Sequence, residues 1–260
     1  MPPQKIIIAL PAFNEARNLS TLLENFEKIF SDHYLRNFQK LYLVVDDGST
    51  DNTLELLQKR SQWLPIKIII HEKNQGLGPT IRDALKEACE QANDTDIIIT
   101  MDADNTHPTN LTKKMVRMIL EGNDVVIASR FRPGAAVVGL HWLRKLMSLG
   151  ARFLLQLTFP IPGVRDFTCG YRAYSAAILK RAFDGYGNTF IEHQGFQCMA
   201  DILLKLRFMD PKIIEVPMVL RYDRKKGSSN MHIVKTVFNT FKLIVRRRFE
   251  KKPDWIIARN

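Results

Sequence analysis

Two acidic residues, Asp102 and Asp104, follow an apolar run in the stretch IIITMDADNTHP, residues 97–108. Successive side chains of an extended segment point to opposite faces, so the two carboxylates of Asp-Ala-Asp can point to the same side. Paired carboxylates bind hard divalent cations such as Mg²⁺ or Mn²⁺, which can bridge diphosphate oxygens. Either aspartate alone could instead cap the next helix or turn. The pair predicts a metal-bound diphosphate.

Polar residues also follow other apolar segments, in PAFNE, VDDGST and HEKNQGLG. In an open α/β sheet, ligands bind beyond the carboxyl ends of the strands. If these ends converge, Glu15, Asp46, Asp47, Asp102 and Asp104 share one cleft. So many carboxylates repel one another unless a cation or several hydrogen-bond donors compensate their charge.

The elements that must position these residues alternate along the chain. Short β-branched runs predict strands, and amphipathic stretches between them predict crossover helices. The predicted fold class is therefore α/β, with a mostly parallel central sheet and flanking helices. The stretch 130–141 is predicted to be a mobile loop. The predicted strands span 5–10, 41–46, 66–71, 96–102 and 124–129, and the predicted helices lie near 17–30, 51–62, 79–92 and 109–121.

Length and composition limit the class of protein. The chain has 260 residues, is 45% hydrophobic, and can bury one sizeable core. It has no apolar run long enough to cross a bilayer, and its first residues lack an export signal, so we expect a cytoplasmic location. Cys89, Cys169 and Cys198 are widely spaced and are interpreted as reduced thiols.

The formal net charge of +11 predicts polyanionic partners, because a basic surface attracts phosphates. Bases outnumber acids mainly after residue 129. A nucleic-acid-binding module is a remote alternative: the chain has no interleaved aromatic-basic motif, and the acidic cleft would repel a phosphate backbone. Neither a phosphate loop nor a Gly-x-Gly-x-x-Gly turn follows the first predicted strand. GLG at 76–78 is either a tight turn or a ligand contact.

Four motifs, in order, carry a resemblance: PAFNEARNL, VVDDGSTDNT, NQGLGPTIRDAL and IITMDADNTHP. Over roughly residues 5 to 230 the chain resembles family 2 glycosyltransferases of the GT-A fold. SRF, WLRKLMSLGARFL, DFTCGYR, GFQCM and DRKKGSSNM are similar to the polyprenyl-phosphate hexosyltransferases. The resemblance implies a GT-A domain over 1–230 and a basic amphipathic C-terminal extension over 231–260.

The same resemblance implies an inverting enzyme that requires Mg²⁺ or Mn²⁺. It would move a hexose, mannose being favoured over glucose, from GDP-mannose or UDP-glucose to a polyprenyl or dolichyl phosphate. The reaction would take place at the cytoplasmic face of a membrane, with the enzyme peripherally attached to the anionic surface. Whether a membrane-anchoring subunit is a further partner stays open.

The resemblance also implies a role for each residue of the site. The catalytic set is Asp102, Asp104, Arg130, Arg144 and Arg224. The nucleotide is bound by Pro11, Glu15, Asp46, Asp47, Gly76 and Asp102. The metal is bound by Asp102, Asp104 and Thr106, the acceptor phosphate by Arg130, Arg144, Ser148, Arg224 and Ser229, and the sugar by Asp166 and Gln197. The chain departs from the family at Thr106, where glutamine is common, at Met199, where an acid is usual, and at Asn230, where lysine is frequent.

The chemistry of the acceptor gives an independent reason to favour a phosphate. A lipid monophosphate is largely anionic at neutral pH, with a second pKa of roughly 6, so transfer to it needs no general base. It needs cations, and a guanidinium matches phosphate oxygens in a two-pronged way. The alternative is a carbohydrate hydroxyl acceptor, for which Asp166 is the available base.

Two amphipathic segments, 140–159 and 231–248, could either lie in a membrane interface or pack on the core. In the first, Leu143, Met147, Phe153, Leu154 and Leu157 form an apolar face. In the second, Val234, Val237, Phe238, Phe241 and Val245 do so, followed by Arg246, Arg247 and Arg248, which we expect to contact anionic headgroups. Of the two histidines near the motifs, His107 is expected to have a supporting role and His193 a structural one.

Overall fold

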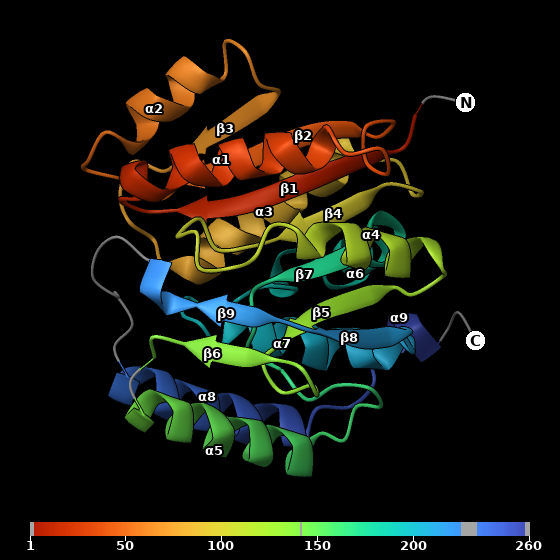
Figure 1. Cartoon of the computed structure of the whole chain (residues 1–260). Helices are drawn as coiled ribbons and strands as arrows, with labels where there is room; N and C mark the ends of the chain where they lie inside the picture. The colour runs from red at the N-terminus through yellow and green to blue at the C-terminus, as the bar shows by residue number, and fades with distance from the viewer. Residues whose placement is uncertain (1–2, 141, 225–232, 258–260) are drawn as a thin grey trace.

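The structure of the chain, a computed structural model, describes residues 3–140, 142–224 and 233–257. Its centre is a seven-stranded sheet (Figure 1), in which every neighbouring pair is parallel except those made by β7. The strands in spatial order are β3 (Ile66–Ile70), β2 (Gln39–Asp46), β1 (Lys5–Ala12), β4 (Ile97–Thr100), β7 (Arg172–Ser175), β5 (Val125–Ser129) and β8 (Ile213–Pro217).

The five strands predicted from sequence are confirmed. Side chains of β1, β4, β5 and the second half of β2 are almost wholly buried, as expected where helices cover both faces of a parallel sheet. Those of the edge strand β3 are half-buried or exposed. The predicted helices are also confirmed as α1 (Ala16–Phe30), α2 (Thr53–Arg60), α3 (Leu77–Gln91) and α4 (Leu111–Leu120).

One prediction about local structure is wrong. Within the stretch 130–141, predicted to be a loop, β6 (Ala136–Val138) forms a strand that pairs in parallel with β9 (Val219–Arg221). The small β6–β9 sheet therefore holds part of this stretch in place.

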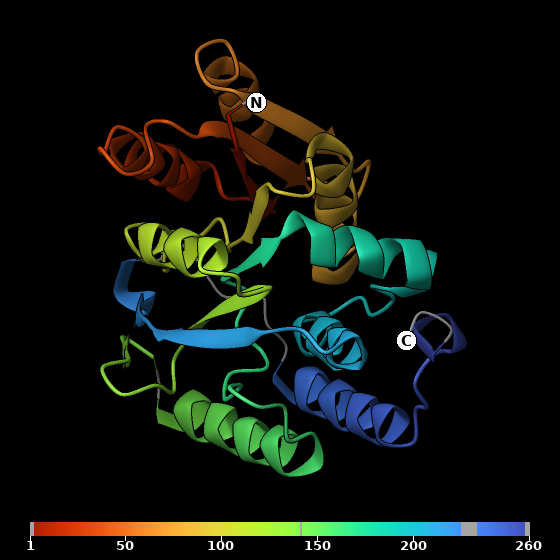
Figure 2. The same ribbon diagram turned by 90° about the vertical axis from the view of Figure 1, so that its right-hand side faces the viewer.

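The second half of the chain supplies the remaining helices. They are α5 (Trp142–Thr158), α6 (Ala176–Tyr186), α7 (Cys198–Leu206), α8 (Ile233–Arg248) and α9 (Asp254–Ile257), with short 3₁₀ turns η1 (Gly187–Thr189), η2 (Arg207–Met209) and η3 (Tyr222–Arg224). Figures 1 and 2 show α5 and α8 side by side, at the end of the molecule opposite β3. Among the described residues, no helix combines the length and apolar content needed to span a bilayer.

Helices α5 and α8 expose many large apolar side chains, which we call the apolar face. The most exposed are Leu157 at 72%, Phe153 at 70% and, just beyond α8, Phe249 at 82%. Isolated exposed apolar residues are ordinary, but a group of this size on two adjacent helices is not. The apolar face comprises Trp142, Leu146, Leu149, Phe153, Leu154 and Leu157 of the first helix and Phe238, Phe241, Val245 and Phe249 of the second.

The basic end of α8 differs from the sequence prediction. Arg246 and Arg248 are exposed, but Arg247 is only 3% exposed and forms ion pairs inside the protein. The expectation that Arg247 contacts headgroups is therefore wrong. Met147, predicted on the apolar face, is half-buried, and the side chains of Leu143, Val234 and Val237 lie outside the described residues.

Candidate active site

A cavity of roughly 800 Å³ opens at the carboxyl ends of β1, β2 and β4. Most of the residues predicted for the nucleotide and metal line it, together with one residue of α8, Asn239. The segment 192–197 closes one side. The predicted residues that line the cavity are Pro11, Glu15, Asp47, Gly76, Asp102, Asp104 and Gln197.

The two neighbouring aspartates of VDDGST have different surroundings. Asp47 lines the cavity and accepts the backbone N–H groups of Gln75 and Gly76 at 2.9 Å each, and its Oδ1 lies 2.7 Å from Nδ1 of His71. Asp46 is buried, accepts the backbone N–H of Ser49 at 3.2 Å, and is not among the cavity residues. Asp47 thus organises the 75–76 loop, whereas Asp46 stabilises its own turn.

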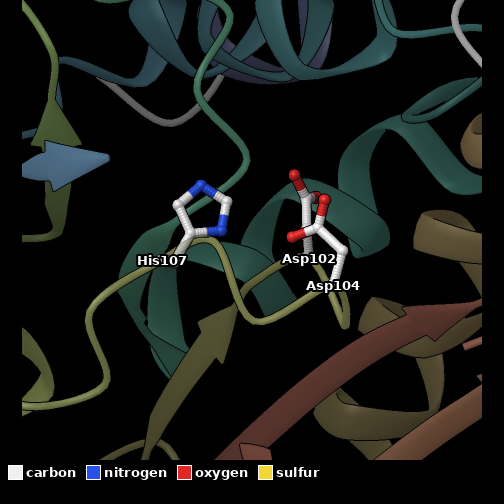
Figure 3. Close-up of side chains that lie close together, drawn as sticks. All are labelled: Asp102, Asp104 and His107. Carbon is white, nitrogen blue, oxygen red and sulfur yellow. The ribbon is translucent and has the colours of Figure 1, made fainter. Parts of the chain in front are cut away.

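Asp102, Asp104 and His107 form a cluster of metal-ligand type. One ligand atom from each lies within 4.8 Å of the others, and Figure 3 shows the imidazole beside the two carboxylates. The turn between them depends on Asn105, whose φ of 59° is left-handed, a region that Asn tolerates better than most residues. Nδ1 of His107 is buried with no hydrogen-bond partner among the described residues, so the cluster fits a divalent cation.

Neighbouring residues hold this cluster in place. Thr106 donates its hydroxyl to Oδ1 of Asp104 at 2.7 Å, so it orients a carboxylate in this structure. A Cβ at Gly170, in the motif DFTCGYR, would lie only 3.1 Å from Oδ1 of Asp102, so glycine leaves room for that carboxylate. From the sequence, His107 was expected to have only a supporting role. In the structure, the turn at Asn105 brings its side chain close to Asp102 and Asp104.

The wall formed by 192–197 is joined directly to the glycine loop 76–78. Gly78 donates its backbone N–H to the carbonyl of Gln194 at 2.9 Å, and a Cβ at Gly78 would lie 1.6 Å from the carbonyl oxygen of His193. GLG therefore permits close backbone packing. In the same wall, Gln197 lines the cavity, and its Oε1 is buried with no hydrogen-bond partner in the described part of the chain.

Arg130 and Asp166, predicted for acceptor and sugar, pair with each other. Nε and one terminal nitrogen of Arg130 donate to Asp166 at 2.8 and 2.6 Å, and backbone N–H groups of Thr168 and Cys169 donate to the same carboxylate. Burial raises the pKa of Asp166, but the Arg130 guanidinium more than offsets this and the pKa lies below its usual range. Neither residue is among those that line the cavity.

Two of the other predicted acceptor residues can be placed in the structure. Arg224 is exposed at the end of η3, and Ser148 is half-buried in α5. Arg144 lies in α5 with its side chain outside the described residues, and Ser229 lies outside them entirely. The backbone N–H of Arg221 donates to the carbonyl of Thr106 at 3.0 Å, so the segment leading to Arg224 is attached to the loop that carries Asp102, Asp104 and His107, which we call the metal-candidate loop.

An ionic cluster that the sequence analysis missed joins Glu192, at the start of the 192–197 wall, to the buried residues Asp201, Lys205 and Arg247. Arg247 and Lys205 pair with Glu192 at 2.7 and 3.1 Å and with Asp201 at 2.5 and 3.3 Å, and Nε2 of His193 lies 3.6 Å from Asp201. Burial raises the pKa of Glu192, but Lys205 and the arginines more than offset this and lower it to about 2.

This lowered pKa predicts how stability depends on pH. A carboxylate with a depressed pKa in the folded state stabilises the protein above its unfolded pKa, about 4.5, and this contribution is lost as the pH falls towards about 2. We expect Glu192→Gln to reduce the loss of melting temperature over this pH window. The measurement is thermal unfolding of both proteins; identical slopes would contradict the prediction.

Comparison with known proteins agrees with this geometry. Residues 7–183 match the family described as Glycosyl transferase family 2. The chain is 31% identical over 255 residues to a dolichol-phosphate mannosyltransferase of Pyrococcus furiosus, covering 97% of this chain and 66% of that one. It is 25% identical over 259 residues to a polyprenol monophosphomannose synthase of Mycolicibacterium smegmatis, covering 96% and 91%.

Solved structures show the same fold. Glucosyl-3-phosphoglycerate synthase from Mycobacterium tuberculosis, in complex with Mn²⁺, UDP and phosphoglyceric acid, matches with a TM-score of 0.65 at 18% identity, covering 96% of this chain and 80% of that one. TarS of S. aureus, in complex with UDP-GlcNAc, matches with a TM-score of 0.60 at 19% identity, covering 94% and 66%. The GT-A fold predicted from sequence is confirmed. Together with the match over most of its length, this shows that the chain belongs to glycosyl transferase family 2.

Proposed function

We propose that this glycosyltransferase moves a hexose, mannose in preference to glucose, from a nucleotide diphosphate sugar to a polyprenyl phosphate at a membrane surface. The observation that carries the proposal is the hydrogen bond from Arg221 to Thr106, which ties the segment ending in Arg224 to the metal-candidate loop. This bond supports the proposal because Arg224, an exposed arginine, then belongs to a segment attached to the loop of Asp104, where an acceptor phosphate would approach a donor diphosphate. The printed names of the two mannosyl-transferring relatives support the same acceptor class.

Each group then has a role in the transfer. Asp102, Asp104 and His107 would hold Mn²⁺ or Mg²⁺, and the bound ion would supply positive charge that compensates the departing diphosphate. An acceptor phosphate oxygen attacks the anomeric carbon while the bond from that carbon to the diphosphate oxygen breaks, which inverts the configuration. The acceptor oxygen is already anionic, so no side chain has to remove a proton.

The rival hydroxyl acceptor receives little support from Asp166. This carboxylate is fully buried, accepts two hydrogen bonds from the Arg130 side chain, and has a pKa below its usual range. A general base needs access to the acceptor proton and a pKa close to the working pH. Asp166 instead fixes the orientation of the Arg130 guanidinium and compensates its charge.

The experiment that tests the function is a transfer assay with a short polyprenyl phosphate, the corresponding polyprenol, and a panel of GDP- and UDP-sugars. We expect product only with the phosphate, and the highest rate with GDP-mannose. Transfer to the polyprenol or to an oligosaccharide, but not to the phosphate, would contradict the proposal. Product with a UDP-sugar would revise the donor alone.

We further propose that the apolar face lies in the membrane interface, which would bring the enzyme to a lipid acceptor. Burying apolar side chains in the interface is favourable, and exposed cations such as Arg248 add attraction to an anionic leaflet. The C-terminal residues 231–260 would then serve as the basic amphipathic extension inferred from sequence. The attachment would be peripheral and on the cytoplasmic side.

Replacing Phe153 and Leu157 together with glutamate is expected to weaken binding to anionic vesicles by at least about tenfold, because apolar area is lost and negative charge is added. Turnover on a short, detergent-soluble acceptor should not change. The matched control is Trp63→Glu, since Trp63 is 69% exposed and lies between α2 and β3 at the other end of the sheet. Co-sedimentation with vesicles is the measurement; equal loss for the control would contradict a localised membrane face.

A further inference from the structure

The inner side of α8 is joined to the wall of the donor cavity through Arg247. Its guanidinium lies 2.5 and 3.0 Å from the two carboxylate oxygens of Asp201 and 2.7 Å from Oε1 of Glu192, and it also pairs with Glu250. Asp201 belongs to α7, and Glu192 begins the 192–197 wall. One side chain thus joins α8, α7 and the wall of the cavity.

Lys205 completes the attachment from the other side. It is 1% exposed, contacts both Glu192 and Asp201, and donates to the backbone carbonyls of Thr189 and Phe190 just before the wall. At its opposite surface, the wall is hydrogen-bonded to Gly78 through Gln194. The wall therefore has two anchors: a backbone contact on the cavity side and an ionic contact behind it.

The cluster is not a second metal site, although Glu192, His193 and Asp201 have ligand atoms within 4.8 Å of one another. The negative charges of Glu192 and Asp201 are already compensated by Lys205 and Arg247, which form ion pairs with both. An added cation would have to displace these ion pairs to bind there. The ion pairs instead connect elements of the fold, which points to a role in positioning.

Helix α8 contributes to the cavity directly as well. Asn239, two turns before Arg247 on the same helix, lines the cavity together with the wall. The contacts of Arg247 with Glu192 and Asp201 therefore also fix the position of Asn239 relative to the wall. A shift of α8 by a fraction of a helical turn would move both sides of the cavity.

We infer that Arg247 is a positioning residue for the donor cavity: it holds the 192–197 wall and α8 in the arrangement that binds a nucleotide diphosphate sugar. The inference rests on the proposed donor. It predicts a defect in donor binding from a residue that does not line the cavity. Acceptor binding, which we assign to the segment of Arg224, should not change.

The informative variant is Arg247→Lys, because lysine keeps the charge but cannot contact both carboxylates in the same two-pronged way. We expect the dissociation constants of GDP and UDP, measured with Mn²⁺ by calorimetry, to rise by about tenfold or more for the better-binding nucleotide, since small displacements at a site have effects of this size. The KM for the acceptor should be unchanged. Arg247→Met should have a larger effect, if it folds.

Two controls separate positioning from loss of stability. Phe26→Leu changes a fully buried side chain in α1 and should lower the melting temperature without changing nucleotide affinity. Arg181→Gln removes an exposed arginine from α6 and should change neither. Wild-type affinity in Arg247→Lys would show that Arg247 only stabilises the fold, and would overturn the inference. If the wild-type protein bound neither GDP nor UDP, the proposed nucleotide-sugar donor would be wrong, and the inference that rests on it would be wrong as well.

Discussion

Replacing Asp104 with alanine is expected to lower the transfer rate by about 10²- to 10³-fold, because the departing diphosphate loses its charge compensation. Asp104 is 7% exposed, lies at the donor cavity, and shares a ligand cluster with Asp102 and His107. His107→Ala should weaken Mn²⁺ binding as well, since its unpartnered Nδ1 is the third donor. The measurements are turnover as a function of Mn²⁺ concentration and direct Mn²⁺ binding.

The control for this prediction is Asp32→Asn, an aspartate outside the cavity that pairs with Lys113 at 2.8 Å. It should leave both Mn²⁺ binding and turnover at wild-type values. Undiminished turnover of the wild-type enzyme in excess chelator would refute the metal requirement. Circular dichroism should show that Asp104→Ala folds normally, so that its lower transfer rate can be assigned to the site.

Arg224→Ala is expected to raise the acceptor KM by about ten- to hundredfold while donor affinity stays unchanged, because charge-assisted hydrogen bonds contribute on the order of 1.5–3 kcal/mol. Arg224→Lys should recover only part of the loss, since lysine restores the charge but not the fork geometry. Arg144→Ala is expected to behave in the same way. The measurement is steady-state kinetics with a polyprenyl phosphate, with nucleotide binding followed separately.

Arg117→Ala serves as the control, because Arg117 is an exposed arginine of α4. Asp166→Asn distinguishes the two acceptor classes. With a phosphate acceptor, its effect should follow from the loosened Arg130 and leave the pH dependence of turnover unchanged. With a hydroxyl acceptor, it should lower turnover severely and remove the acidic limb of that pH dependence, because that limb reports protonation of the general base. A normal acceptor KM in both Arg224→Ala and Arg144→Ala would remove the main support for a lipid-phosphate substrate.

Five of the seven strands, all except β7 and β8, were predictable from sequence because they are near-continuous apolar runs separated by amphipathic helices. The antiparallel β7 was not predicted, since it is only four residues long and begins with Arg172, a charged residue that is nevertheless fully buried. Arg172 donates to the carbonyls of Met199 and Phe167 at 2.7 Å. These contacts are made across the fold, and no local pattern reports them.

The site, like the sheet, has a part that the sequence predicted and a part that it did not. The aspartates of the metal cluster lie within one short motif, so their spacing alone predicted them. Arg247 lies 55 residues from Glu192, and in the run of three arginines it resembled a solvent-exposed tail. Helical periodicity could have separated it from Arg246 and Arg248 only if the buried face of α8 had been known.

The contact between Gly78 and the carbonyl of His193 has a consequence for the evolution of specificity. Because one side of the cavity is fixed by backbone against backbone, its width does not depend on any side chain at that point. Side chains that project from the wall, such as Gln194 and Gln197, can be exchanged without moving the wall itself. New sugar preferences could therefore arise by single substitutions there, whereas any side chain at position 78 would force the two halves of the cavity apart.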